Sequence, residues 1–164
     1  MCFASRRSSR SCVCHPGQHA MLSIMHRALS EYPRVTSDKV RYADTDRQGH
    51  VNNALFATFL ETARVEIFYD PTHPLADQGA EFVIAHLSLD FLGEIRWPGS
   101  VVVGTAVRRI GRSSVTLEQA IFQDERCVAR AEVIVVQIDT VTRKACPLPE
   151  RTREPLDALR FPEP

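Results

Sequence analysis

The stretch "RYADTDRQGHVNNALFATFLETARVEIF", residues 41–68, joins a polar loop to a helical pattern. The loop contains two aspartates, Asp44 and Asp46, followed by Gly49, His50 and a pair of asparagines. Residues 53–68 then repeat apolar side chains at the spacing of one helix face: Phe56, Phe59, Leu60, Ala63 and Ile67. The stretch therefore predicts a long amphipathic helix that begins directly after carboxylates and an imidazole.

The ends of this helix are marked by ordinary local signals. Asn52 or Asn53 can cap its N-terminus, because a short amide side chain accepts from the free N–H groups of the first turn. The segment "DPTHPLADQG", residues 70–79, contains two prolines and predicts a loop that follows the helix.

The rest of the chain reads as strands. Residues 34–42 predict a strand before the loop, and four more runs follow the helix at 81–91, 100–110, 113–123 and 127–139. In the first of the four, alternation places Val83, Ala85, Leu87 and Leu89 on one face. The order predicts an α+β domain in which one face of an antiparallel sheet covers the helix.

Length and charge restrict the class of protein. The chain of 164 residues predicts one domain at residues 31–150 and a tail at 151–164. We expect the chain to lie on the surface from Pro147 onward. No apolar run of about 18 residues occurs, so no membrane span is expected. Beyond residue 30 the chain carries 16 basic and 20 acidic side chains, a net charge of −4, which argues against a nucleic-acid partner.

Residues 1–30 differ from the rest, with four arginines and no acidic side chain. This composition fits an organelle transit peptide. The alternative is a translation start assigned too early, with Met21 or Met25 as the true start. On either interpretation the segment is an extension outside the fold. We expect a cytoplasmic protein, or an imported one if the segment is a transit peptide.

The cysteines indicate a reducing compartment rather than a disulfide framework, because their number is odd. Three of the five lie in the N-terminal extension: Cys2, Cys12, Cys14, Cys127 and Cys146. The run "CVCH" at residues 12–15 lacks the second ligand pair of a zinc site, so no metal is predicted there.

The aspartate loop has three interpretations. A calcium-binding loop is excluded, since Leu55 falls where the bidentate glutamate is required. Asp44, Asp46 and the asparagines can instead form only a turn and a helix cap. Alternatively, Asp46 and His50 lie beside the free N–H groups of a helix start, a combination suited to attack on a thioester or ester. Spacing alone does not decide between the turn-and-cap interpretation and the catalytic one. The sequence contains no "GxSxG" motif, so a serine nucleophile is unsupported.

Residues 42–64, "YADTDRQGHVNNALFATFLETAR", resemble the signature of hotdog-fold acyl-CoA thioesterases of the 4-hydroxybenzoyl-CoA thioesterase type. They are also similar to the "D-x-N-x-H-V-N-N" segment of acyl-ACP thioesterases. The likeness continues through residues 83–122 and covers about 33–148. It implies the hotdog fold: one long helix wrapped by an antiparallel sheet of about five strands.

The resemblance implies roles for the loop. Asp46 corresponds to the catalytic carboxylate, either a nucleophile or the base that activates water, and the backbone N–H of Asn53 corresponds to the donor that polarises the carbonyl. His50 matches the histidine of the acyl-ACP enzymes; its alternative role is to hold the turn. Gln48 replaces their asparagine, which weakens the acyl-ACP interpretation. With Gly49, Gln48 is expected to contact the substrate.

Other predicted site residues lie outside the loop. In the resembling enzymes the segment corresponding to Gly111, Arg112, Ser113 and Ser114 lines the coenzyme A channel, where Arg112 would meet a phosphate. The alternative is an ordinary hairpin turn. His86 is expected to border the acyl pocket.

Glu61 is a reserve catalytic carboxylate, whose alternative is an exposed helical pair with Arg64.

The predicted function is hydrolysis of an acyl-CoA thioester to a free acid and coenzyme A, without metal or organic cofactor. The alternatives are acyl-ACP hydrolysis and a non-catalytic acyl-CoA-binding module. The resemblance also implies a homodimer or homotetramer with its active site between subunits. The acyl group, the oligomer size and the role of Asp46 as nucleophile or base are not fixed by the sequence.

Overall fold

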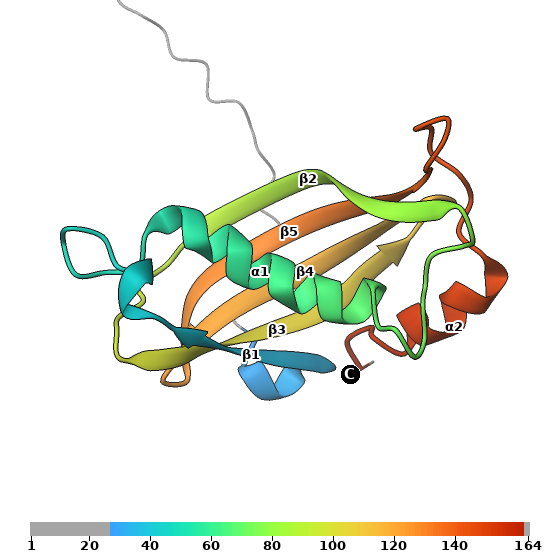
Figure 1. Cartoon of the computed structure of the whole chain (residues 1–164). Coiled ribbons are helices and arrows are strands. Elements are labelled where there is room, and N and C mark those ends of the chain that lie inside the picture. Colours follow the sequence, from blue (N-terminus) through green and yellow to red (C-terminus); the bar gives the residue numbers. More distant parts are fainter. Residues whose placement is uncertain (1–26, 163–164) are drawn as a thin grey trace, which may run out of the picture.

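The computed structural model describes residues 27–162 (Figure 1), so the "CVCH" run lies outside the described residues. A single long helix, α1 (Asn53–Phe68), has the bounds that the apolar spacing predicts. The other elements are η1 (Leu29–Glu31), β1 (Arg34–Val40), η2 (Tyr42–Asp44), β2 (Ala80–Phe91), β3 (Gly99–Ile110), β4 (Ser114–Gln123), β5 (Arg126–Asp139) and α2 (Glu150–Asp157). No helix within 27–162 is long and apolar enough to cross a membrane.

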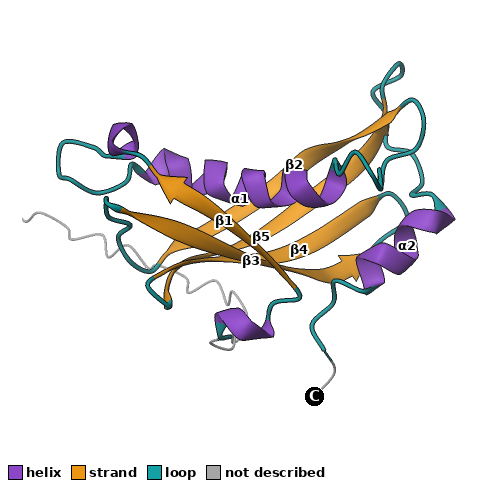
Figure 2. Cartoon of the chain, turned by 60° about the horizontal axis from the view of Figure 1, so that its bottom comes forward, coloured by secondary structure: helices purple, strands orange, loops and turns teal. Residues whose placement is uncertain are grey.

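The five strands form one antiparallel sheet in the order β1-β3-β4-β5-β2. Helix α1 lies across one face of this sheet, and η1 lies against the other (Figures 1 and 2). The predicted α+β architecture is therefore confirmed. Strands β1 and β2 are the two edges, so each pairs on one side only within residues 27–162.

The core between α1 and the sheet contains one buried cation. Arg64 is only 7% exposed and donates to Oε1 of Gln119 at 3.0 Å. Gln119 in turn donates to the carbonyl of Leu60 and the hydroxyl of Thr105. Burial lowers the pKa of the Arg64 guanidinium. The expected exposed pair between Glu61 and Arg64 is wrong, because Arg64 points into the core.

Strand β2 departs from simple alternation. Its pairing with β5 shifts register between Ile84 and His86, which is a β-bulge. Before the bulge in the sequence, Phe82 packs on Phe68 of α1, with ring centres 4.6 Å apart. Beyond it Leu87 and Leu89 pack against the same core. The expectation that Val83 shares their face is wrong, because the extra residue moves every later side chain to the other face.

The C-terminal segment is not a surface tail throughout. Leu148, Thr152 and Leu156 are buried, and Leu156 is 0% exposed. The Thr152 hydroxyl donates to the carbonyl of Leu75 at 2.7 Å. Helix α2 thus packs onto the domain beside β3, and the expected surface position holds only for its outer side chains.

Part of the face of the sheet opposite α1 is covered by both ends of the described chain. Tyr32 packs edge-on against Phe122 of β4 and Phe161 near the C-terminus, with ring centres 6.1 and 5.3 Å away. The Arg27 guanidinium lies 3.9 Å from the centre of the Phe161 ring. The Tyr32 hydroxyl donates to Glu118 at 3.1 Å, which ties the N-terminal segment to the sheet.

Candidate active site

The aspartate loop is a tight turn that brings its two ends together. The backbone N–H of Asp46 donates to the carbonyl of His50 at 2.8 Å, and that of Gly49 donates to the carbonyl of Asp46 at 3.0 Å. Gly49 has a φ of 81°, a conformation that suits glycine. The N–H of Gln48 donates to Oδ1 of Asp46 at 2.7 Å. The carboxylate and imidazole therefore stand at the two sides of one turn.

Helix α1 begins immediately beyond this turn. Asn52 is the N-cap, since its side chain accepts from the N–H of Ala54 at 3.0 Å. Asp44 is structural: its carboxylate accepts from Arg41 N–H at 2.7 Å, and its carbonyl accepts from Asn52 N–H at 2.9 Å. The N–H of Asn53 has no acceptor among residues 27–162. The first helical residue thus presents a free donor at the positive end of the helix dipole.

An open pocket of about 430 Å³ brings these groups together. Four predicted site residues line it, namely Asp46, Gln48, His50 and Asn53. The remaining lining residues supply an apolar wall and one more carboxylate: Val51, Phe56, Phe91, Leu92, Gly93 and Glu94. Phe56 and Phe91 meet edge to face, with ring centres 5.0 Å apart. In the described part of the chain no group of acidic, histidine or cysteine side chains could hold a metal ion.

The segment between β2 and β3 forms the second side of the pocket. Val51 donates its N–H to the carbonyl of Ile95 at 2.9 Å, and His50 pairs with Arg96 through a β-bridge. An oxygen of Glu94 lies 3.1 Å from Nε2 of His50 and 2.7 Å from a guanidinium nitrogen of Arg96. Sequence reasoning missed Glu94, since a single glutamate in a turn carries no distinctive local signal.

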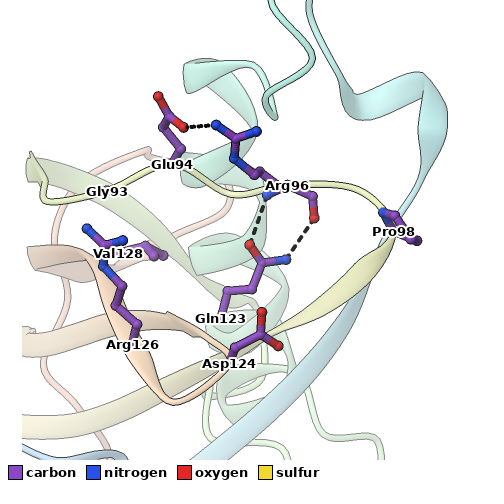
Figure 3. A pocket seen from close by; sticks show the side chains of 8 residues that line it. All are labelled: Gly93, Glu94, Arg96, Pro98, Gln123, Asp124, Arg126 and Val128. Atoms are coloured by element: carbon purple, nitrogen blue, oxygen red, sulfur yellow. Dashed lines mark hydrogen bonds and ion pairs between the residues drawn. The ribbon is translucent and has the colours of Figure 1, made fainter.

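Gln123 fixes this segment from the end of β4, as Figure 3 shows. Its side chain accepts from the N–H of Arg96 and donates to the carbonyl of Arg96, both at 2.8 Å. Glu94 and Arg96 also border a neighbouring pocket of about 530 Å³, which continues along Asp124 and Arg126. The two pockets share Gly93 and Glu94.

Other predicted site residues lie elsewhere in the chain. Gly111, Arg112, Ser113 and Ser114 form the β3–β4 hairpin, at the end of β3 far from the aspartate loop (Figure 1). A 12-residue strand spans roughly 35 Å at about 3.3 Å per residue. The hairpin backbone holds the C-terminal segment, since the Arg112 carbonyl accepts from Leu148 N–H at 2.8 Å. Its predicted contact with coenzyme A stays a prediction.

His86 and Glu61 also stand apart from the pocket. His86 is exposed on the edge strand β2, and Glu61 is exposed on α1. Neither lines the pocket that contains Asp46. Within one chain, therefore, the structure unites the residues of the loop and does not bring the hairpin or His86 to them.

Comparison with known proteins identifies the family. The model of the Thioesterase-like superfamily matches residues 40–156, and the chain belongs to that family. The acyl-CoA thioesterase YbgC of Haemophilus influenzae is 25% identical over 126 residues, which are 74% of this chain and 93% of that protein.

Solved structures agree with this result. A thioesterase from Thermus thermophilus, solved with coenzyme A and zinc, is 29% identical with a TM-score of 0.68 and covers 82% of this chain and 98% of its own. The PA5185 protein of Pseudomonas aeruginosa shares the fold at 23% identity, with a TM-score of 0.74 over 84% of this chain and 98% of its own. The predicted hotdog fold and thioesterase family are confirmed; the 4-hydroxybenzoyl-CoA type stays a prediction.

Proposed function

We propose that this protein hydrolyses an acyl-CoA thioester to a free carboxylic acid and coenzyme A. The observation that carries the proposal is the convergence of the Asp46 carboxylate, the His50 imidazole and the free N–H of Asn53 on one pocket. Membership of the Thioesterase-like superfamily and similarity to an acyl-CoA thioesterase support it.

Each group has a role in the reaction that its chemistry suits. The Asn53 N–H, at the start of α1, stabilises the negative charge that develops on the thioester oxygen. Asp46 either attacks the carbonyl carbon or takes a proton from the water that attacks it; we leave both routes open. His50 carries a proton to the sulfur that leaves. One water enters, and its atoms end in the acid and the thiol. The proposal includes no metal or organic cofactor.

The pocket walls indicate where the substrate lies. We propose that Phe56 and Phe91 contact the acyl group, because they form the apolar side of the pocket that faces the polar groups. Gln48 lines the pocket on the loop side, whereas Gly49, also predicted to contact the substrate, does not line it. We expect the cytoplasm as the compartment, where acyl-CoA esters are available.

We propose a homodimer, or a tetramer built from such dimers. Strand β2 is a 12-residue edge, and edges of that length are normally paired or covered. Antiparallel pairing of two β2 edges would set the Phe91 end of one subunit beside the Ala80 end of the other. The β3–β4 hairpin lies at that second end, so Arg112 of one subunit would approach the pocket of the other.

The test is a free-thiol release assay on short, medium, long and aromatic acyl-CoAs, with an acyl-ACP as an additional substrate. We expect Asp46→Asn to lower kcat by about 10²–10⁴-fold, the usual contribution of a positioned proton-transfer or nucleophilic group. Asp38→Asn, on β1, is the matched control. Light scattering checks that every variant keeps the mass of a dimer.

Three outcomes would change the proposal. Full activity in Asp46→Asn would remove Asp46 from the mechanism and make Glu61 the next carboxylate to test. A wild type that binds acyl-CoAs and hydrolyses none would favour the binding module. Hydrolysis of the acyl-ACP alone would favour the acyl-ACP thioesterase.

A further inference from the structure

We propose that Glu94 is a positioning residue for His50, and that it holds the imidazole proton on Nε2 so that Nδ1 keeps the free lone pair. The catalytic consequence of this arrangement rests on the proposed function. The position of the proton itself does not, and it can be measured without any substrate.

The contact between the two side chains carries the proposal. Nε2 of His50 lies 3.1 Å from Oε2 of Glu94, and both residues line the pocket that contains Asp46. A carboxylate can only accept hydrogen bonds, whereas a neutral imidazole has one N–H and one lone pair. A lone pair on Nε2 would lie close to the negative oxygen and be repelled, whereas an N–H there is attracted to it, so the N–H belongs on Nε2.

Glu94 has a second partner besides His50. A guanidinium nitrogen of Arg96 donates to the same oxygen, Oε2, at 2.7 Å. Both backbone groups of Arg96 are held by Gln123 at the end of β4 (Figure 3). The β-bridge between His50 and Arg96 fixes the backbone on the other side. The sheet and the aspartate loop therefore hold the backbone of Arg96, whose guanidinium donates to the carboxylate beside the imidazole.

This arrangement has a consequence for proton transfer. On the route in which Asp46 takes a proton from the attacking water, that proton passes on to Nδ1 of His50, the ring becomes a cation beside the Glu94 carboxylate, and that charge is compensated locally. The proton then passes from His50 to the sulfur of coenzyme A, and the imidazole returns to its neutral form. The hydroxyl of the water stays with the acyl carbon. Glu94 gives up and receives no proton.

A surface ion pair without functional consequence is the competing explanation. Glu94 and Arg96 have side chains that are 53% and 66% exposed, and such pairs contribute little to stability. That explanation predicts no dependence of the His50 ring on Glu94. It also predicts that removing Glu94 affects activity equally with and without His50.

The first experiment is ¹⁵N NMR of the full chain labelled at histidine, at a pH where His50 is neutral. The His50 signals are assigned by their loss in His50→Gln. We expect the shifts of a ring protonated on Nε2, and a smaller difference between the two nitrogens in Glu94→Ala. Glu81→Gln breaks a comparable pair with Arg143 away from the pocket and should change nothing. A proton on Nδ1 in the wild type, or no change in Glu94→Ala, would overturn the proposal.

The second experiment is a double-mutant cycle in the thiol release assay. We expect Glu94→Ala to lower kcat by about 10- to 100-fold with little change in KM, a part of the about 10²–10⁴-fold that positioned proton transfer contributes. In a His50→Ala background, Glu94→Ala should cause no further loss. Equal losses in both backgrounds would show a merely structural role and overturn the proposal. If the wild type hydrolyses no thioester, the proposed function fails, and the NMR result alone decides the role of Glu94.

Discussion

Gly49 shapes the turn that carries Asp46 and His50. Its φ of 81° closes the turn in which Asp46 N–H reaches the carbonyl of His50. No atom lies within 4 Å of the position a Cβ would take, so the site has room for a side chain. The constraint at Gly49 is therefore the backbone conformation and not crowding.

We expect Gly49→Ala to lower the free energy of unfolding by about 1–2 kcal/mol, the usual cost of a left-handed conformation for an L residue. Activity should fall as well, since the turn carries both proposed catalytic side chains. Gly49→Asn should be milder on both counts, because asparagine tolerates this conformation. Urea unfolding and thiol release measure the two effects. Equal stability of Gly49→Ala and the wild type would show that the turn has another accessible geometry.

At the residue scale, the sequence predicted those parts of the site that are neighbours in the chain. Asp46, Gln48, His50 and Asn53 share a pocket because one turn and one helix start contain them all. Glu94 could not be found in this way. Its contact with His50 depends on a bridge between segments far apart in the sequence.

At the scale of elements, prediction followed the strength of the local pattern. Helix α1 has five apolar residues on one face, and its bounds were predicted correctly. The bulge in β2 adds one residue without any change of composition, so alternation alone assigned Val83 to the wrong face. Helix α2 reads "ERTREPLD", with five charged side chains and Pro155, and only its packing on the sheet reveals Leu156 as a core residue.

We expect Leu156→Ala to destabilise the protein by about 2–5 kcal/mol, the range for removing a fully buried leucine side chain. Glu154→Ala, on the exposed side of the same helix, should stay within about 0.5 kcal/mol of the wild type. Urea unfolding of the three proteins makes the comparison. A loss in Leu156→Ala no larger than in Glu154→Ala would show that α2 adds little to the fold.

At the scale of the whole molecule, the sheet is covered on one face and on part of the other. Helix α1 covers one face, and the two ends of the described chain meet on the other (Figure 2). Tyr32 is the centre of that second layer, only 5% exposed and bonded to Glu118. Burial, and then the negative charge of Glu118, raise the pKa of the Tyr32 phenol above its usual range.

This shift predicts how stability depends on alkaline pH. A pKa raised in the folded state means that the stabilisation is complete below about pH 10, the unfolded value, and is lost as the pH rises above it. Between about pH 9 and 11, around the pKa of tyrosine in the unfolded chain, Tyr32→Phe should therefore lose less stability than the wild type. At neutral pH it should be about 1 kcal/mol less stable, since it lacks the hydrogen bond to Glu118.

The exposed Tyr42 provides the control for this experiment, because Tyr42→Phe should follow the wild type at every pH. The free energy of unfolding from urea titrations at neutral and alkaline pH measures the effect. An equal loss of the free energy of unfolding at alkaline pH in Tyr32→Phe and the wild type would contradict the prediction for Tyr32.

The contact between Arg27 and Phe161 also determines how the chain could be reconnected. Because Arg27 and Phe161 lie side by side, residues 27–162 could be circularly permuted. A short glycine–serine linker could join residue 162 to residue 27, and new ends could be opened in the exposed turn at 141–144. The sheet order and the pocket would stay the same, while the permuted chain would begin and end in the turn after β5 and run continuously from residue 162 to residue 27.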